Sequence, residues 1–271
     1  MKRATLSAVA ALALTLTTSF TTAAHAETIK VGVVPGAYAE TIEALVPEAK
    51  AAGIDIEAVE FTDWTTPNVA LDAGDIDVNY FQHRPFLDNA IKDRGYKLTD
   101  VGAGILANIG LYSQKHKSFD EIPQDGTVAI ANDPVNQGRG LLLIEKAGLI
   151  KLREGVGFQG TLDDIVENPR NLSFTEVEGP QLARVTGDVD LALGYPHFIA
   201  ASGLFDPGSG LLYSGIDDLR FAILFTVKED RKDDPLLKKL VELYQHSDAV
   251  RQAADKAYHS NDKLYTLSWQ R

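Results

Sequence analysis

The segment NDPVNQGRG (132–140) carries the strongest signal for small-molecule binding in this 271-residue sequence. It places Arg139, between Gly138 and Gly140, just before the apolar run LLLIEKAGLI, so we predict this arginine at the beginning of a helix. The positive helix end favours an anion there, and a guanidinium can bind a carboxylate through two parallel hydrogen bonds. We therefore predict that Arg139 binds a carboxylate, with a surface or interlobe ion pair as the alternative. Asn136 can donate to the same group or hold the loop turn.

The segment VNYFQHRP (78–85) sets two aromatic rings, an amide and a histidine side by side. If a strand extends through it, Tyr80 and Phe81 point to opposite faces, so that one packs in the core while the other can contact a ligand. His83 can cap the helix that Pro85 begins, pack in the core or line a pocket. No carboxylates accompany His83 at metal-ligand spacing, so we predict neither a metal site nor a cofactor.

The sequence offers little support for a catalytic site. It contains no cysteine, which excludes a thiol nucleophile, disulfides and thiolate metal sites. It also lacks a G-x-S-x-G segment, and no Ser-His-Asp arrangement follows from spacing alone. Asp63, Asp75 and Asp77 lie close together, but such carboxylates usually cap turns and face water. We therefore expect no enzymatic activity, with an exported hydrolase as one alternative class and a scaffold that binds no ligand as another.

Strand-like and helix-like segments alternate along the chain. The β-rich runs are TIKVGVV (28–34), IDIEAVEF (54–61), IDVNYF (76–81), TVAIA (127–131), LSFTEVE (172–178), VDLALG (189–194) and RFAILFTV (220–227). Thr66 with Pro67, and Asp234 with Pro235, have the cap and first-turn proline of a helix beginning, and Gly74 ends a short helix. These repeated units predict an α/β fold with mainly parallel sheets flanked by helices.

Two series of these units, separated by GLYSQKHKSFDEIP (110–123), predict two lobes. We place the first part of lobe 1 at residues 27–111, lobe 2 at 112–222, and the return to lobe 1 with the C-terminal helices at 223–271. No long polar linker joins the two series. Strands that cross between the lobes are therefore expected to form a hinge beside a cleft.

The residues just after each strand are the next candidates for the cleft, because ligands in open α/β sheets bind beyond the carboxyl ends of the strands. This position adds Tyr38, in PGAY, and Trp64, in TDWTTPN. Their rings suit an apolar chain or an ammonium group over a ring face, although either residue could also belong to the core.

The N-terminus has the pattern of a secretory signal peptide. Lys2 and Arg3 precede the apolar run AVAALAL (8–14), and small residues around Ala26 mark a cleavage site before Glu27. The apolar run is much shorter than the roughly 20 residues of a membrane-spanning helix, so we expect an exported protein that does not insert into the membrane. The formal net charge of −12 also argues against nucleic acid as a partner, because an acidic surface repels a phosphate backbone.

At the level of whole segments, the chain resembles the NlpA/MetQ family of methionine-binding substrate-binding proteins of ABC transporters. The matching segments are VGVVPGAYAE, EFTDWTTPNVALDAGDIDVNYFQHRPFLD, IGLYSQKHKSFDEIPQDGTVAIANDPVNQGRGLLLIEKAGLIKL and DIVENPRNL. The resemblance implies a two-lobed, type II-like periplasmic-binding-protein fold that closes on a free amino acid. It also implies a membrane permease as partner and a periplasmic location, and we expect a monomer. Family members usually carry a lipid on an N-terminal cysteine, which is absent here, so a freely diffusing protein is expected.

The resemblance also bears on single residues. It implies that Arg139 binds the ligand carboxylate and that Phe81 and His83 line the pocket. Where the family has two asparagines in an N-G-N-Y segment, this chain has GYPHF, with Tyr195 and His197 as candidate ligand contacts. A further family asparagine corresponds to Ile223. These departures leave several ligands open besides methionine: another amino acid, a methionine derivative or a short peptide.

Overall fold

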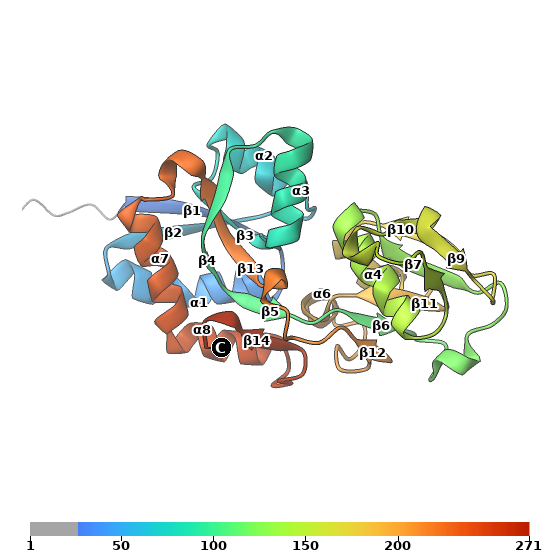
Figure 1. Ribbon diagram of the computed structural model, residues 1–271. Coiled ribbons are helices and arrows are strands. Elements are labelled where there is room, and N and C mark those ends of the chain that lie inside the picture. The colour runs from blue at the N-terminus through green and yellow to red at the C-terminus, as the bar shows by residue number, and fades with distance from the viewer. Residues whose placement is uncertain (1–26, 271) are drawn as a thin grey trace, which may run out of the picture.

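The computed structural model describes residues 27–270, which form two lobes with an α/β sheet in each (Figure 1). The predicted α/β architecture is thus confirmed. The strands are β1 (Glu27–Val33), β2 (Ile54–Glu60), β3 (Val78–His83), β4 (Leu98–Ala103), β5 (Ile105–Ala107), β6 (Gly110–Tyr112), β7 (Thr127–Ala131), β8 (Lys151–Leu152), β9 (Ile165–Glu167), β10 (Ser173–Val177), β11 (Leu191–Gly194), β12 (Leu212–Tyr213), β13 (Ile223–Lys228) and β14 (Tyr265–Leu267). The α-helices are α1 (Ala37–Ala51), α2 (Thr66–Ala73), α3 (Arg84–Arg94), α4 (Pro134–Lys146), α5 (Leu182–Val185), α6 (Pro196–Ser202), α7 (Pro235–His246) and α8 (Asp248–Ala257).

The first lobe is built on a sheet in the order β2-β1-β3-β13-β4. Strand β13 is antiparallel to both of its neighbours, so the other strands all run in one direction. Helices α2 and α3 lie on one side of the sheet, and α1, α7 and α8 lie on the other (Figure 1). Strand β13 is apolar except for Thr226 from Ile223 to Val227, and it is buried over this range, as expected of a central strand covered on both faces.

The second lobe repeats this plan with a sheet in the order β10-β7-β11-β6-β12. Here β6 is the antiparallel strand, and the other strands again share one direction. The residues of β7 from Val128 to Ala131 are buried. Both sheets are therefore mainly parallel. The antiparallel strand of each sheet, β13 in the first lobe and β6 in the second, follows directly after the chain has crossed from the other lobe.

Two segments carry the chain between the lobes and run side by side. The Leu211 N–H donates to the Leu111 carbonyl at 2.7 Å, and the Ser214 N–H donates to the Ile109 carbonyl at 3.0 Å. Strand β5 of the outgoing segment pairs with β14 near the C-terminus. We propose that these paired crossings form the hinge. The lobe limit predicted between residues 111 and 112 lies inside β6, and the limit predicted between residues 222 and 223 lies where β13 begins.

The helix ends follow the predicted local chemistry with one shift. Asp234 caps α7, since its carboxylate accepts from the Leu236 N–H at 2.9 Å, and Gly74 ends α2 in the left-handed conformation. Helix α2 begins at Thr66 rather than after it, because the Asp63 carboxylate accepts from the backbone N–H of both Thr65 and Thr66. A helix N-terminus leaves several N–H groups without backbone partners, and Asp63 serves two of them.

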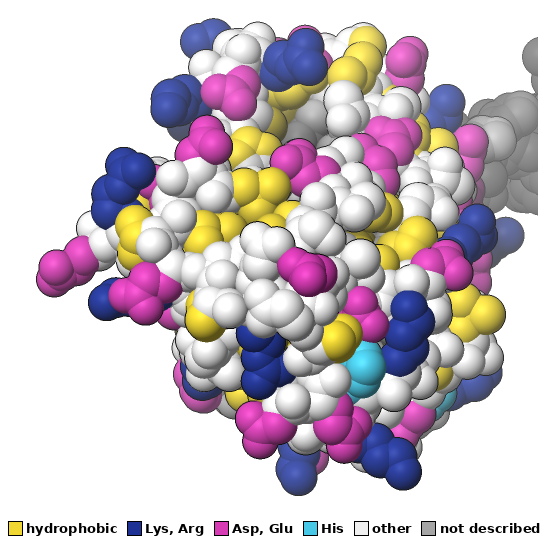
Figure 2. Space-filling model, turned by 90° about the vertical axis from the view of Figure 1, so that its right-hand side faces the viewer, with side chains coloured by type: hydrophobic (Ala, Val, Ile, Leu, Met, Phe, Trp, Pro, Cys, Tyr) yellow, Lys and Arg dark blue, Asp and Glu magenta, His cyan; other side chains and the backbone are white. Residues whose placement is uncertain are grey.

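Between residues 27 and 270, no helix has the length and apolar character to cross a bilayer, and no cluster of three or more His, Asp or Glu side chains could hold a metal ion. The predicted signal peptide, residues 1–26, lies outside the described residues. Seen from the side of the second lobe, acidic and basic side chains alternate over the surface (Figure 2). This face therefore has no continuous basic patch of the kind that binds nucleic acid.

Candidate functional site

A cavity of about 450 Å³, including the part open to solvent, lies where the two lobes meet. Its walls consist of aromatic and apolar side chains with a few polar groups, the usual composition of a small-molecule site. The lining residues are Tyr38, Trp64, Phe81, Gln82, His83, Phe86, Ala107, Asn108, Ile109, Asn136, Arg139, Tyr195, His197, Phe221 and Ile223. All the side chains predicted from the sequence are therefore here except Tyr80.

The strands bring these residues together because their carboxyl ends meet at the cleft. Tyr38 follows β1, Trp64 follows β2 and His83 ends β3, whereas Arg139 lies in the helix after β7. Gly36, with φ of 90°, brings the turn after β1 against the second lobe, where a Cβ would lie 2.9 Å from the His197 carbonyl oxygen. Each lobe thus supplies part of the wall.

Arg139, Asn136 and His83 form a hydrogen-bonded group across the cleft. The Arg139 Nη1 donates to the Asn136 Oδ1 at 2.9 Å, and His83 Nε2 lies 3.1 Å from the same oxygen. His83 Nδ1 accepts from the Phe86 N–H at 3.2 Å, which favours the tautomer with the ring proton on Nε2, directed at Asn136. The Arg139 Nη1 also lies 3.2 Å from Nε2, a contact that would need the other tautomer to be a hydrogen bond. His83 therefore both caps α3 and lines the cavity. Burial, together with the charge of Arg139, lowers the pKa of His83 to about 3, so the ring is neutral.

The orientation of Asn136 is fixed from behind by Asp133, the N-cap of α4. The Asp133 carboxylate accepts from the Asn136 backbone N–H at 2.9 Å and from Nδ2 at 3.1 Å. With Nδ2 engaged in this way, only the amide oxygen faces Arg139 and His83. Asn136 therefore holds the turn, one of the two roles that the sequence left open, and also positions the guanidinium. Its donation to a ligand carboxylate stays a prediction.

Arg139 is the cationic side chain of the cavity wall. Its guanidinium carbon lies 4.0 Å from the centroid of the Phe221 ring, and burial lowers its pKa. An arginine nevertheless stays protonated in proteins. Among residues 27–270, no carboxylate lies within ion-pair distance of it. The carboxylates of Asp133 and Asp218 favour its charged form but make no ion pair with it. A partly buried charge without an ion-pair partner is costly, so the site is suited to bind an anion.

Tyr195 and His197 stand at the beginning of α6 and face the cavity from the second lobe. Within the described chain, the Tyr195 hydroxyl and His197 Nδ1 are buried without a hydrogen-bond partner. Burial lowers the pKa of His197 to about 3 and raises that of Tyr195 well above its usual value. Both side chains are therefore neutral, and the His197 ring lies 4.5 Å from that of Tyr38 in the first lobe.

The Trp64 ring of the first lobe packs against aromatic rings of the second lobe. Its ring lies 5.1 Å from that of Tyr195, edge to face, and 6.1 Å from that of Phe198. Opposite the indole is Gly179, where a Cβ would lie only 2.0 Å from a ring carbon. The second lobe thus leaves room for an indole from the first.

Tyr80 was predicted as a candidate site residue, and the structure corrects this. The side chain lies in the core of the first lobe, stacked on Phe225 with 4.3 Å between ring centroids. Its hydroxyl accepts from the Ile105 N–H at 2.9 Å and bonds to the Tyr244 hydroxyl at 2.9 Å. Successive strand residues point to opposite faces, and it is the neighbouring Phe81 that lines the cavity.

Several lining residues had escaped the sequence reasoning, and Asn108 and Phe221 are two of them. Asn108 lies in the outgoing crossing, where its side-chain oxygen accepts from the Ser214 hydroxyl at 2.8 Å and from the Gly215 N–H at 2.9 Å. A lone amide in the apolar run ILANIGL was the available signal. Phe221 had been assigned to a strand, but it ends a 3₁₀ helix, Leu219–Phe221, and so turns toward Arg139.

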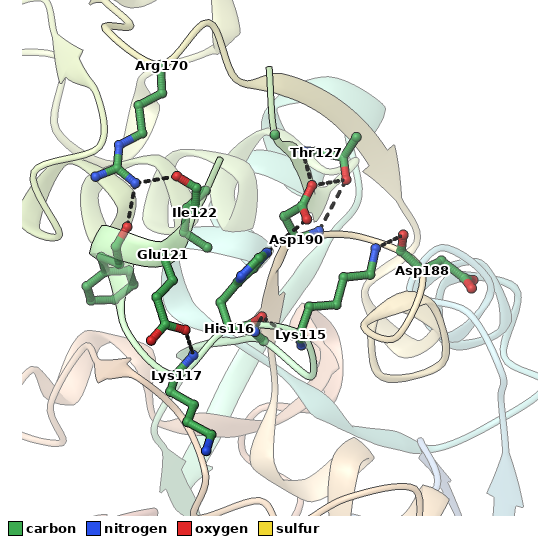
Figure 3. Close-up of polar contacts among 12 residues, drawn as sticks. Lys115, His116, Lys117, Glu121, Ile122, Thr127, Arg170, Asp188 and Asp190 are labelled. Carbon is green, nitrogen blue, oxygen red and sulfur yellow. Dashed lines mark hydrogen bonds and ion pairs between the residues drawn. The ribbon is translucent and has the colours of Figure 1, made fainter. Parts of the chain in front are cut away.

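A second polar cluster lies in the second lobe, away from the cavity (Figure 3). His116 Nε2 lies 3.0 Å from one oxygen of Asp190, whose other oxygen accepts from the Thr127 N–H at 2.8 Å. These contacts lower the pKa of Asp190 to about 2. The Lys115 ammonium donates to the Asp188 carbonyl nearby at 2.7 Å. The cluster ties the loop after β6 to β7 and β11, so its role is structural.

Solved structures with the same fold include substrate-binding proteins. A methionine-binding protein, MetQ, is 44% identical with a TM-score of 0.81, covering 86% of this chain and 95% of that one. A nutrient-binding protein from Burkholderia cenocepacia bound to methionine is 38% identical with a TM-score of 0.82, covering 89% and 99%. A periplasmic substrate-binding protein of an ABC transporter from Coxiella burnetii is 36% identical with a TM-score of 0.80, covering 86% and 97%. The two-lobed binding-protein fold is thereby confirmed.

Sequence comparison agrees with the structural likeness. The D-methionine-binding lipoprotein MetQ of Salmonella typhimurium is 46% identical over 233 residues, which are 85% of this chain and 86% of that protein. The protein of the same name from Escherichia coli (strain K12) is 45% identical over the same length, with the same coverage. The family model described as NlpA lipoprotein matches residues 29–265. The chain belongs to the NlpA lipoprotein family.

Proposed function

We propose that this protein is the substrate-binding component of an ABC importer, which captures methionine or a related amino-acid-type ligand in the periplasm and delivers it to a membrane permease. The names of the relatives support methionine as the reference ligand. The position of the cavity between two lobes supports capture by closure, because a ligand that contacts both lobes favours the form in which they meet.

The single observation that carries this proposal is the environment of Arg139. Its guanidinium is partly buried, held in place by Asn136 and Phe221, and without an ion-pair partner in the described part of the chain. A ligand carboxylate would supply the missing negative charge and the acceptor atoms. The neighbouring aromatic rings would enclose the apolar part of the ligand.

The composition of the cavity wall favours binding over catalysis. The lining contains no serine, threonine, aspartate or glutamate side chain that could act as nucleophile or paired general base. Both lining histidines are neutral, with pKa values lowered to about 3 by burial. An exported hydrolase is therefore the weaker candidate.

Replacement of Arg139 tests the proposal. In Arg139→Ala, the affinity for a carboxylate ligand measured by calorimetry should fall by about 2–5 kcal/mol, the range for removal of one partner of a buried charge pair. Arg153→Ala is the matched control, because Arg153 lies in the same lobe and is exposed in an ion pair with Asp164. An Arg139→Ala protein with unchanged affinity would remove the basis of the proposal.

A different carboxylate is the second candidate ligand, because Tyr195, His197 and Ile223 occupy the wall where the family resemblance led us to expect asparagines. The expectation of a protein free of a lipid anchor stays a prediction, since several relatives are named lipoproteins. The expectation of a monomer also stays a prediction.

A further inference from the structure

The outgoing crossing is hydrogen-bonded to the C-terminal segment before it reaches the second lobe. Strand β5 of this crossing pairs with β14 in antiparallel fashion (Figure 1). At one end of the pair, the Gly104 carbonyl accepts from the Ser268 hydroxyl at 2.6 Å. At the other end, the Asn108 N–H donates to the Leu264 carbonyl at 2.7 Å. The first half of the crossing is therefore fixed to the segment that follows α8 of the first lobe.

Beyond Asn108, the same crossing changes its partner. The Ile109 carbonyl accepts from the Ser214 N–H, and β6 pairs with β12 in the second lobe. This half of the crossing is therefore fixed to the returning segment. Asn108 lies where one paired ribbon ends and the next begins, and hinge residues are typically such positions at the ends of elements.

The side chain of Asn108 joins the two ribbons. Its Nδ2 donates to the Lys263 carbonyl at 2.9 Å. Its Oδ1 accepts from the Ser214 hydroxyl at 2.8 Å and from the Gly215 N–H at 2.9 Å. Gly215 has φ of 98°, in the left-handed region that favours glycine. The amide, only 3% exposed, therefore ties the C-terminal segment to the returning crossing through three hydrogen bonds.

These bonds determine how Asn108 acts on a ligand. An amide oxygen has two lone pairs, and Ser214 and Gly215 take both. The oxygen is therefore engaged by the crossings and not left for the ligand. Ala107 and Ile109, its neighbours in the chain, line the cavity as well. A shift of the junction between the two ribbons would move this part of the wall.

We propose that Asn108 is a positioning residue for ligand capture, which holds the two crossings and the C-terminal segment in the arrangement of the closed lobes. Separation of the lobes breaks its bonds to Ser214 and Gly215. The inference rests on the proposed function, in which the lobes close on a ligand. Bonds made only in the closed form increase the population of that form, and the apparent affinity follows this population.

Ser214→Ala tests the inference, because it removes one of these bonds and Ser214 lies outside the lining of the interlobe cavity. The probes are L-methionine and D-methionine. The affinity of the tighter one, measured by calorimetry, should fall about three- to tenfold, the effect of one neutral hydrogen bond. In stopped-flow experiments, the dissociation rate should rise by the same factor, while the association rate changes little.

Two further variants serve as matched controls. Ser214→Thr keeps the hydroxyl, and its methyl group has room because Ser214 lines a separate pocket, so the affinity should return to that of the unmodified protein. Ser209→Ala should leave the affinity unchanged, since the Ser209 hydroxyl donates to the Asp206 carbonyl at 2.7 Å within its own loop.

Asn108→Ala shows whether the two residues act through one bond. Adding Ser214→Ala to it should lower the affinity by no more than about a further twofold, because the bond is already lost. An affinity loss in Asn108→Ala with none in Ser214→Ala would assign a direct ligand contact and overturn the inference. A lower free energy of unfolding in Ser214→Ala, with affinity and rates unchanged, would also overturn it, because the bond would then serve stability alone.

If neither enantiomer binds the unmodified protein, the proposed function fails, and the inference is decided without ligand. The chain has no cysteine, so Lys92→Cys with Gln159→Cys provides two specific sites for spin labels. Both residues line a groove between α3 and the second lobe. Electron–electron resonance should show a longer distance between the labels when Ser214→Ala is added. An unchanged distance distribution would overturn the inference.

Discussion

At the scale of the residue, the contact between the lobes depends on volume as much as on polarity. Trp64 enters a space that exists because residue 179 has no side chain. The same indole packs against Tyr195, which lines the cavity. The Trp64 ring therefore contacts the second lobe at Gly179 and also contacts a residue of the cavity wall. A change in how closely the lobes approach would move this wall.

Gly179→Ala should disturb this fit. The new methyl group would lie within 2.0 Å of the indole, so Trp64 must move and the lobes cannot approach as closely. Ligand affinity should fall by about tenfold, in line with the usual cost of overpacking a tight site. Calorimetry measures it, with Gly187→Ala as control, since a Cβ there makes only an ordinary contact, 3.6 Å from Gln114. Equal affinity in both variants would show that this contact does not govern closure.

Single residues were predictable where chain position and chemistry agreed. His83 could be placed at the cavity because it lies at a helix beginning after a buried strand. Arg139 was also predicted at a helix beginning, but α4 begins at Pro134, so Arg139 lies in its second turn. The sequence could not show which of Tyr80 and Phe81 lines the cavity. Alternation along a strand places the two side chains on opposite faces, but it does not show which face belongs to the core. Phe221 was missed because its apolar neighbours favoured a strand where the chain forms a 3₁₀ turn.

At the scale of the element, the contacts of Asp190 join separate segments of the second lobe. This carboxylate joins the beginning of β7, through Thr127, to the loop after β6, through His116 (Figure 3). The His116 contact and the Thr127 N–H lower the pKa of Asp190 from 3.8 to about 2. A depressed carboxyl pKa stabilises the folded state above pH 3.8, and this contribution is lost as the pH falls from about 4 toward about 2.

Asp190→Asn should lower the free energy of unfolding by about 1–3 kcal/mol at pH 7, because hydrogen bonds to a charged acceptor are lost. The difference from the unmodified protein should shrink as the pH falls below about 4. Denaturant titrations at several pH values measure both. Asp188→Asn is the control, because only the backbone carbonyl of this exposed residue takes part in the cluster. A pH-independent difference would contradict the assigned role of the charge.

The elements themselves were predictable in part. The strands β1, β2, β3, β7 and β13 lie in β-rich runs, and α3, α4, α7 and α8 begin after a side-chain cap. The short buried strands β5 and β6 were not predicted. The order of the strands was not predictable. Strand β13 pairs with β3 and β4 although more than 100 residues separate them along the chain, and local propensity contains no information on such pairing. The antiparallel insertion of β6 and β13 likewise follows from the crossings between lobes rather than from the segments.

At the scale of the whole molecule, the cavity is lined by residues of both lobes and of a crossing segment between them. Asn108 illustrates this, because it lines the cavity and also bonds to Ser214 in the returning segment. Its backbone N–H donates to Leu264 near the C-terminus at 2.7 Å. A ligand bound in this cavity would therefore lie beside the segments that we propose as the hinge.

The most direct test of the central claim compares a ligand with its own primary amide. Methionine, the ligand named for the relatives, and its primary amide differ only at the group assigned to Arg139. Calorimetry on the unmodified protein should show the amide weaker by about 2–5 kcal/mol, because the partly buried guanidinium then lacks its counter-charge. Equal affinity for the acid and the amide would contradict the account.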